Sequence, residues 1–132
     1  MVFLDLSRND LASLPDTFSE LENLEVCCLE GNQIIVRKDT FNMLSSLRKL
    51  TMHYNHIKHI FSDIGGCTNT TYFDGSVNGI EELPPEIGLM TSLQELKLNY
   101  NNLTSLPPEL GSCTNLQKLE ISHNKIEGSL PG

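Results

Sequence analysis

The chain contains no tryptophan, no long apolar run and no excess of basic residues. Its apolar stretches are only a few residues long, whereas a membrane-spanning helix needs about 20. Its formal net charge of −8 disfavours a nucleic-acid backbone or an anionic membrane surface as the partner. The sequence therefore predicts neither membrane insertion nor nucleic-acid binding.

Sequence motifs of catalysis are missing as well. The chain has no nucleophile motif, no glycine-rich phosphate loop and no HExxH metal motif. Its acidic residues are numerous but spread along the whole length. We therefore expect no enzymatic activity and no cofactor.

What the chain does contain is an internal repeat. Units that start near residues 1, 24, 47, 70, 93 and 116 carry apolar residues at positions 1, 4, 6 and 11, such as Leu93, Leu96, Leu98 and Leu103. A fixed period of this length indicates stacked repeats. Position 9 of every unit is an asparagine, and the six are Asn9, Asn32, Asn55, Asn78, Asn101 and Asn124.

Each unit predicts a short strand followed by a turn. Positions 3 to 8 alternate between apolar and polar residues, which is typical of a strand with one buried face. Stacked units would pair these strands in a parallel sheet over one continuous core. The asparagine amide offers both a donor and an acceptor, so we expect the column of asparagines to bond the turns of successive units.

The second half of each unit is also regular. Apolar residues near positions 14, 18 and 21 predict a 3₁₀ turn or a short helix on the outer face. In the second unit Arg37 and Lys38 replace the usual Leu-Pro pair, so Val36 or Ile35 must supply the inward contact. In the fourth unit, Gly75 replaces an inward leucine, and we expect the oversized Phe73 to fill that space.

These residues match the pattern LxxLxLxxNxL, and the chain resembles the leucine-rich repeat family over essentially its entire length. The resemblance implies a curved α/β solenoid of about six repeats. It also implies a parallel sheet on the concave face and short 3₁₀ or helical segments on the convex face. We expect one leucine-rich repeat domain over residues 1–132.

The four cysteines favour a reducing compartment. Cys67 and Cys113 occupy the same inward position two repeats apart, about 10 Å, which exceeds the roughly 7 Å Cα separation that a disulfide tolerates. Cys27 and Cys28 are strand neighbours that point to opposite faces. We therefore predict that Cys27, Cys67 and Cys113 are core residues and that the protein is cytoplasmic.

The two ends match the repeat pattern without the atypical polar caps that usually close a solenoid. We expect this chain to be a fragment of a longer repeat array, or to self-associate end to end through its open edge strands. No signal peptide is expected, because Met1 to Asp5 already belong to the first repeat. The glycosylation sequons at Asn69 and Asn102 keep an extracellular location open.

Side chains at positions 3, 5, 7 and 8 are expected on the concave face, where solenoids bind their partners. All three tyrosines fall at these positions, and tyrosine is enriched at interface hot spots, although it is also well tolerated on a sheet surface. We expect the strongest contribution from Tyr54 and Tyr100. The candidate partner-binding residues are Lys49, Thr51, His53, Tyr54, Tyr72, Asp74, Val77, Glu95, Lys97, Asn99, Tyr100 and His123.

Three histidines lie three residues apart, at His53, His56 and His59. Such a group could in principle bind a metal ion. Their repeat positions, 7, 10 and 13, run from the strand through the turn and do not converge. We predict that they are solvated surface residues without a metal, and leave a pH-sensitive role open.

Charge is distributed unevenly along the chain. Residues 1–30 carry seven acidic residues and only one basic residue, whereas residues 37–58 carry five basic residues against one acidic residue. A bipolar surface of this kind suits steering toward a protein that has its own charge pattern.

We therefore predict a non-catalytic scaffold that binds a protein partner on its concave face. The Leu-Pro-Pro-Glu-Ile-Gly and Leu-Pro-Pro-Glu-Leu-Gly segments are similar to intracellular leucine-rich repeat proteins, some of which engage small GTPases or act as signalling scaffolds. The segment from Ile126 to Pro131 resembles a longer plant-type unit, which keeps a receptor-like ectodomain open. Further alternatives are a regulatory segment of a multidomain kinase or GTPase and a structural subunit of a large assembly.

Overall fold

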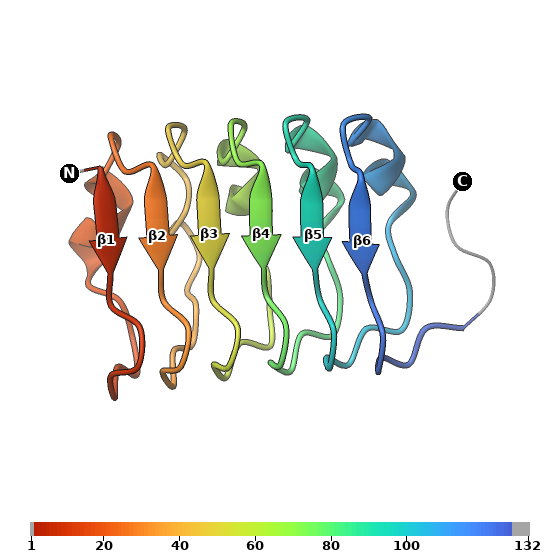
Figure 1. Ribbon diagram of the computed structural model, residues 1–132, viewed down its shortest axis with the longest axis horizontal. Coiled ribbons are helices and arrows are strands. Elements are labelled where there is room, and N and C mark those ends of the chain that lie inside the picture. The colour runs from red at the N-terminus through yellow and green to blue at the C-terminus, as the bar shows by residue number, and fades with distance from the viewer. Residues whose placement is uncertain (1, 128–132) are drawn as a thin grey trace.

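Six short strands form one parallel sheet in the order of the sequence. The computed structural model describes residues 2–127. Figure 1 shows the strands side by side along the long axis of the molecule. They are β1 (Phe3–Asp5), β2 (Val26–Cys28), β3 (Lys49–Thr51), β4 (Tyr72–Asp74), β5 (Glu95–Lys97) and β6 (Lys118–Glu120). Residues one repeat apart pair with one another, so that Lys49 lies beside Tyr72 and Tyr72 beside Glu95.

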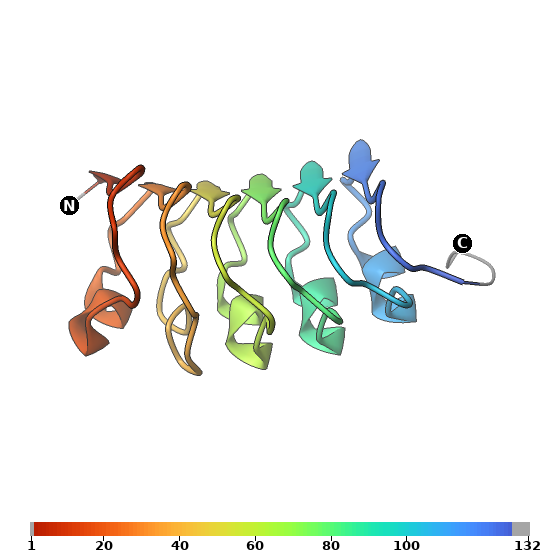
Figure 2. The ribbon, with the colours of Figure 1, turned by 90° about the horizontal axis from the view of Figure 1, so that it is seen from below.

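Within residues 2–127, four 3₁₀ helices lie across the core from the sheet. Figure 2 shows the strands along the inner side of a shallow arc and these helices along its outer side. They are η1 (Asp16–Glu20), η2 (Ser62–Gly66), η3 (Pro85–Leu89) and η4 (Pro108–Ser112). Each follows an extended residue, which is a proline in three of the four cases. The predicted curved solenoid, with a concave sheet and convex 3₁₀ segments, is confirmed.

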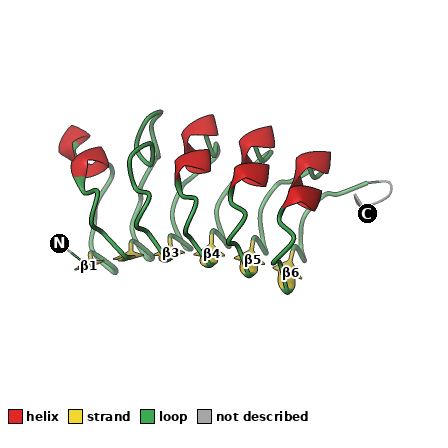
Figure 3. Ribbon diagram, turned by 90° about the horizontal axis from the view of Figure 1, so that it is seen from above, coloured by secondary structure: helices red, strands yellow, loops and turns green. Residues whose placement is uncertain are grey.

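The second repeat differs from its neighbours on the outer side. Between β2 and β3 the chain makes turns and no 3₁₀ helix, as Figure 3 shows by the missing red segment. Val36 turns inward and is only 7% exposed, whereas Ile35 is 63% exposed. Val36 therefore supplies the inward contact where Arg37 and Lys38 replace the usual Leu-Pro pair.

The strands are shorter than the alternation at positions 3 to 8 predicts, because each ends at position 5. Position 8 adopts a positive φ in every repeat, between 54° and 74°, which is incompatible with an extended strand. These six residues are Arg8, Gly31, Tyr54, Val77, Tyr100 and His123. Backbone pairing nevertheless continues beyond the strand, since the Leu29 amide donates to the Thr51 carbonyl at 2.8 Å.

The recurring asparagines join consecutive repeats through their side-chain amides. Asn101 Nδ2 donates to the Leu98 carbonyl of its own repeat and to the Gly75 carbonyl of the preceding one, both at 3.1 Å. Its Oδ1 accepts from the Ile80 amide of the preceding repeat at 3.0 Å. Asn124 Nδ2 donates to the same Leu98 carbonyl at 2.9 Å, so this carbonyl accepts from two asparagines. The result is a continuous chain of side-chain and backbone hydrogen bonds along the solenoid.

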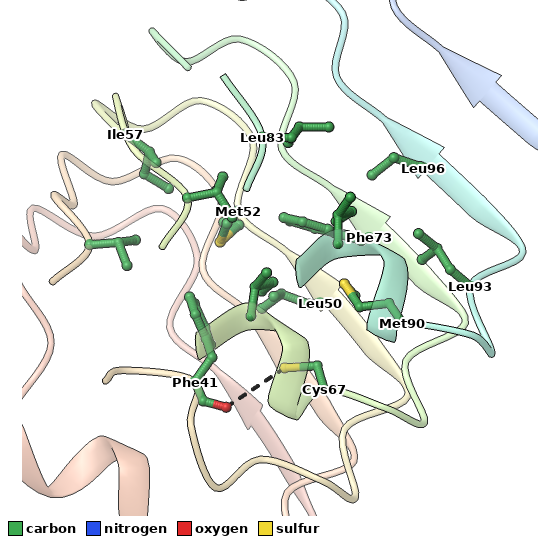
Figure 4. Close-up of a cluster of buried hydrophobic side chains, with 14 of the residues drawn as sticks. Phe41, Leu50, Met52, Ile57, Cys67, Phe73, Leu83, Met90, Leu93 and Leu96 are labelled. Atoms are coloured by element: carbon green, nitrogen blue, oxygen red, sulfur yellow. Dashed lines mark hydrogen bonds between the residues drawn. The ribbon is translucent and has the colours of Figure 1, made fainter. Parts of the chain in front are cut away.

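The core lies between the sheet and the 3₁₀ helices, as the close-up in Figure 4 shows. Phe73 is fully buried there, and its ring lies 3.6 Å from the point where a Cβ on Gly75 would stand. Leu98 and Ile80 lie closer to that point, at 3.2 and 3.4 Å, so Phe73 fills the space beside Gly75 only together with them. The Cys67 thiol points to the Phe41 carbonyl, with 3.9 Å between sulfur and oxygen (Figure 4).

The three inward cysteines are core residues, as predicted. Cys27 and Cys67 are fully buried and Cys113 is 5% exposed. Burial disfavours the thiolate and raises the pKa of both Cys27 and Cys67 to about 12. Cys28 points to the other face of the sheet and is half-buried.

Candidate functional site

The concave face is formed by two rows of side chains that cross the sheet. Position 3 supplies Lys49, Tyr72 and Glu95 on consecutive strands, and position 5 supplies Thr51, Asp74 and Lys97. Parallel strands in this register place equivalent residues about 4.8 Å apart. One peptide segment lying across the strands would therefore meet several repeats at once.

Beyond the carboxyl ends of the strands, the position 8 residues form a ridge that is exposed at Tyr54, Tyr100 and His123 and half-buried at Val77. The tyrosines Tyr54 and Tyr100 are 61% and 55% exposed, and both belong to the left-handed turn that follows a strand. The alternation of apolar and polar residues predicts both tyrosines on the strands themselves, which is wrong because their positive φ ends the extended backbone before them. The Tyr100 ring stacks on the His123 ring, with 4.1 Å between centroids and 5° between planes. We call Tyr54, Val77, Tyr100 and His123 the aromatic ridge.

Tyr72 has a different environment from the other two tyrosines. It is half-buried in the middle of the sheet, where two lysines approach its ring. The Lys49 Nζ lies 5.4 Å from the ring centroid and the Lys97 Nζ lies 5.2 Å from it, within the range of cation–π interactions. The hydrogen bond with Tyr72 raises the pKa of Lys97 above its ordinary value. Tyr72 is thus flanked by lysines, whereas Tyr54 and Tyr100 are exposed to solvent.

A diagonal set of polar contacts links position 7 of one repeat to position 5 of the next. The pairs are Glu30 with Thr51, His53 with Asp74, and Asn99 with Glu120. The Asn99 amide and the Lys118 ammonium hold the pKa of Glu120 below its ordinary value. The roles of Glu30 and Glu120 as partners of Thr51 and Asn99 were not predicted from the sequence. Polar residues that recur 21 residues apart are the signal that could have indicated these pairs.

These contacts reduce the surface that some predicted residues offer to a partner. Thr51 is only 6% exposed, and its hydroxyl donates to Glu30. The Asp74 side chain is 13% exposed, and its Oδ1 accepts from the Ser76 amide at 3.0 Å. Both side chains therefore hold neighbouring residues of the concave face in place and offer little surface to a partner.

The three histidines lie in different environments. His56 and His59 are exposed, as predicted. The prediction is wrong for His53, whose side chain is 28% exposed and whose buried Nδ1 lies 3.4 Å from Asp74 Oδ2. Across residues 2–127, no group of three or more His, Cys, Asp or Glu side chains has an arrangement suited to a metal ion.

Ion pairs join the acidic beginning of the chain to the basic segment that follows. Arg37 lies 3.8 Å from Asp16, and Arg48 lies 3.5 Å from Glu25. Their side chains are largely exposed, so each pair contributes little to stability. The uneven charge is therefore partly neutralised between adjacent repeats.

Comparison with known families agrees with the repeat geometry. A family model described as leucine-rich repeat matches residues 1–21, and a second, described as leucine-rich repeats in two copies, matches residues 91–131. The chain belongs to the leucine-rich repeat family. Domains of this family typically bind other proteins.

Curated relatives match about three fifths of this leucine-rich repeat chain. Keratocan of Bos taurus is 33% identical over 85 residues, which cover 61% of this chain and 24% of keratocan. The volume-regulated anion channel subunit LRRC8A of Homo sapiens is 34% identical over 83 residues, 61% of this chain and 10% of that subunit. The chain therefore spans about a quarter or less of the length of these relatives.

Solved leucine-rich repeat structures superpose on nearly the whole chain. A leucine-rich repeat protein of Leptospira interrogans has a TM-score of 0.90 at 32% identity, covering 96% of this chain and 32% of its own. The ectodomain of the plant membrane receptor kinase GASSHO1/SCHENGEN3 from Arabidopsis thaliana has a TM-score of 0.90 at 30% identity. That match covers 99% of this chain and 16% of the ectodomain, which was solved in complex with CASPARIAN STRIP INTEGRITY FACTOR 2.

None of the helices in the described part of the chain has the length and apolarity that crossing a membrane requires.

Proposed function

We propose that this leucine-rich repeat chain is a non-catalytic scaffold that binds a protein partner on its concave face. The observation that carries the proposal is the aromatic ridge, in which two tyrosines more than half exposed stand two repeats apart beside the concave rows. Tyrosine combines a large apolar area with a polar tip, and it dominates many interface hot spots. The ridge and the rows offer one elongated surface of the kind that solenoids use for binding.

The turn geometry supports a role in recognition, because it presents the two tyrosines rigidly. The Tyr54 amide donates to the Ser76 carbonyl at 3.1 Å, and the Tyr100 amide donates to the Ser122 carbonyl at 2.9 Å. Each backbone is therefore fixed to the next repeat while its ring stays accessible. A fixed backbone lowers the conformational entropy that is lost on binding.

A matched pair of double variants tests this proposal. Tyr54→Ala with Tyr100→Ala removes the ridge, whereas Ile35→Ala with Leu89→Ala removes apolar residues of similar exposure, 63% and 56%, from outside the concave face. We expect the tyrosine double variant to bind the partner about 2 kcal/mol or more weakly than the wild type does, and to remain folded. The partner would be captured from a cell extract, identified by mass spectrometry, and titrated against each variant.

Circular dichroism and thermal unfolding of all variants separate lost binding from lost structure. If the control pair weakens binding as much as the tyrosine pair does, the aromatic ridge is not the recognition surface. If the tyrosine pair leaves binding intact, the partner uses another face.

We extend the proposal to an intracellular signalling scaffold, with a small GTPase or signalling enzyme as the partner. The buried thiols Cys27, Cys67 and Cys113 support a reducing compartment, because each is a core residue. Co-purification of such an enzyme with the wild type, and not with the tyrosine pair, is the expected result. Recovery of extracellular proteins alone would contradict this assignment.

A receptor-like ectodomain is a second candidate, favoured by the similarity to the plant receptor kinase ectodomain. In that case Asn102 is the better glycan acceptor, since Asn102 and Thr104 of its sequon are both exposed. In the other sequon Asn69 Nδ2 donates to the Ser45 carbonyl at 2.7 Å, and Thr70 is fully buried. Glycan mapping on the protein from its own source distinguishes the two candidates.

A further inference from the structure

Two lysines on the concave face have no ion-pair partner in the described chain. Lys49 on β3 and Lys97 on β5 both approach the ring of Tyr72 on β4, at 5.4 and 5.2 Å. The ion pairs of residues 2–127 use Arg37, Arg48, His53 and Lys118 as their basic members. Two ammonium groups therefore lie near the Tyr72 ring, and within residues 2–127 neither forms an ion pair with a carboxylate.

Asp74 and Glu120, the carboxylates beside Lys97 in the position 5 row, have other partners. Asp74 accepts from the Ser76 amide at 3.0 Å and faces His53. Glu120 accepts from Asn99 Nδ2 at 2.9 Å and lies 3.2 Å from Lys118 Nζ. Because both carboxylates are held in place by these contacts, an external anion can approach Lys49 and Lys97 without displacing an internal one.

The surrounding charges also select the kind of anion. Asp74 and Glu120 flank Lys97 on position 5, and Glu95 lies beside Tyr72 on position 3. A polyanion such as a nucleic acid would be repelled by these three carboxylates, and the net charge of −8 adds to that repulsion. A single carboxylate needs only the space above the ring and the two ammonium groups.

We propose that Lys49, Tyr72 and Lys97 form a carboxylate-binding site that holds an isolated Asp or Glu side chain of an extended partner segment. This inference rests on the proposed function and specifies the partner's chemistry. The two ammonium groups attract the carboxylate, and the Tyr72 hydroxyl offers it a hydrogen-bond donor. Apolar residues of the same segment would lie on the aromatic ridge, which follows the strands at their carboxyl ends.

Peptide display on the immobilised protein tests this site without knowledge of the natural partner. A random linear peptide library is selected against the wild type, against Lys49→Gln with Lys97→Gln, and against Lys118→Gln as the control. Lys118 occupies the same row as Lys49 but already pairs with Glu120. We expect peptides selected on the wild type and the control to be enriched in a single acidic residue, and those selected on the double variant to lack it.

The strongest binding peptide is then synthesised with its acidic residue and with the matching amide, and both forms are titrated by fluorescence anisotropy. We expect the amide form to bind the wild type about tenfold or more weakly, and the difference to vanish on the double variant. Equal affinities on the wild type, a preference that survives in the double variant, or the absence of any selected peptide would overturn the inference. The tyrosine variants described above test the proposed function separately, because they are expected to weaken both peptide forms equally.

Discussion

Interior and terminal repeats share one sequence pattern but differ in how completely their residues are buried. Leu96 and Leu98 of the fifth repeat are fully buried, whereas the equivalent residues Leu4 and Leu6 of the first repeat are only partly buried. The same contrast applies to the asparagines, since Asn101 is 6% exposed and Asn9 is exposed. A repeat is therefore stabilised by its two neighbours as much as by its own residues, as expected for a solenoid.

The asparagine at position 9 gives the sharpest contrast between the two kinds of repeat. We expect Asn101→Ala to lower the free energy of unfolding by about 2–4 kcal/mol, because the buried Ile80 amide and Gly75 carbonyl lose a partner. Asn9→Ala removes two exposed hydrogen bonds, to the Leu6 and Ser7 carbonyls, and should cost less than about 1 kcal/mol. Urea unfolding followed by circular dichroism measures both.

Asn101→Asp serves as the isosteric control for this prediction. It keeps the shape and the acceptor but replaces the amide donor by a carboxylate oxygen that faces the carbonyls of Gly75, Leu98 and Asn99. We expect it to destabilise at least as much as Asn101→Ala. Equal costs for the Asn101 and Asn9 variants would mean that the asparagine chain does not connect the repeats energetically.

A second contrast concerns the outer side of the solenoid. A Cβ on Gly88 would stand 2.6 Å from the Glu109 carbonyl oxygen of the next repeat, which is too close without a shift of the backbone. We expect Gly88→Ala to cost about 1–3 kcal/mol, as overpacking does. Gly111→Ala at the equivalent, exposed position should be close to neutral. Thermal unfolding of the two variants tests this difference, and a neutral Gly88→Ala would show that adjacent 3₁₀ helices can move apart freely.

Val77 is a strained position inside the array. It has a φ of 54°, although branched side chains rarely adopt the left-handed region. We expect Val77→Asn to raise the free energy of unfolding by about 1 kcal/mol, since asparagine tolerates this conformation. Arg8→Asn, at a φ of 57° in the first repeat, should raise it less because arginine is not branched at Cβ. A loss of stability in Val77→Asn would mean that the contacts of the valine side chain outweigh the backbone strain.

The cysteines compare repeats at different places in the array without any substitution. At pH 8, alkylation by iodoacetamide should be fastest at the half-buried Cys28, slower at Cys113 and slowest at Cys27 and Cys67. Cys113 lies beside the last repeat, where local opening is easiest. Peptide mapping by mass spectrometry gives the order, and equal rates at Cys67 and Cys113 would contradict it.

The same thiols predict a pH dependence of stability. Burial raises the pKa of Cys27 and Cys67 from 9.0 to about 12, so the folded state binds their protons more tightly than the unfolded state does. This contribution is fully present below pH 9 and is lost as the pH rises toward 12. Cys67→Ala should therefore show a smaller fall in stability over that range than the wild type, measured by unfolding at a series of pH values.

Much of the fold could be predicted from the sequence, because the same pattern of apolar and polar residues recurs every 23 residues in six repeats. The sheet and the inward positions all follow from residues such as Leu96 and Leu98. The outer 3₁₀ segments were predictable in most repeats but not in the second, where Arg37 and Lys38 replace the residues that begin such a segment. The separation of Tyr72 from Tyr54 and Tyr100 was not predictable, because alternation alone does not show where a strand ends.

The repeat, the parallel sheet and the residues that face the core follow from the sequence alone, since each results from periodic burial of apolar side chains. The three-dimensional arrangement was needed to show which lysines approach Tyr72 and that His53 faces Asp74. It was also needed to show that Tyr54 and Tyr100 follow the strands in left-handed turns. Those features depend on contacts between residues of different repeats. Such contacts arise only when the repeats stack, because stacking places side chains about 21 to 25 residues apart within reach of one another.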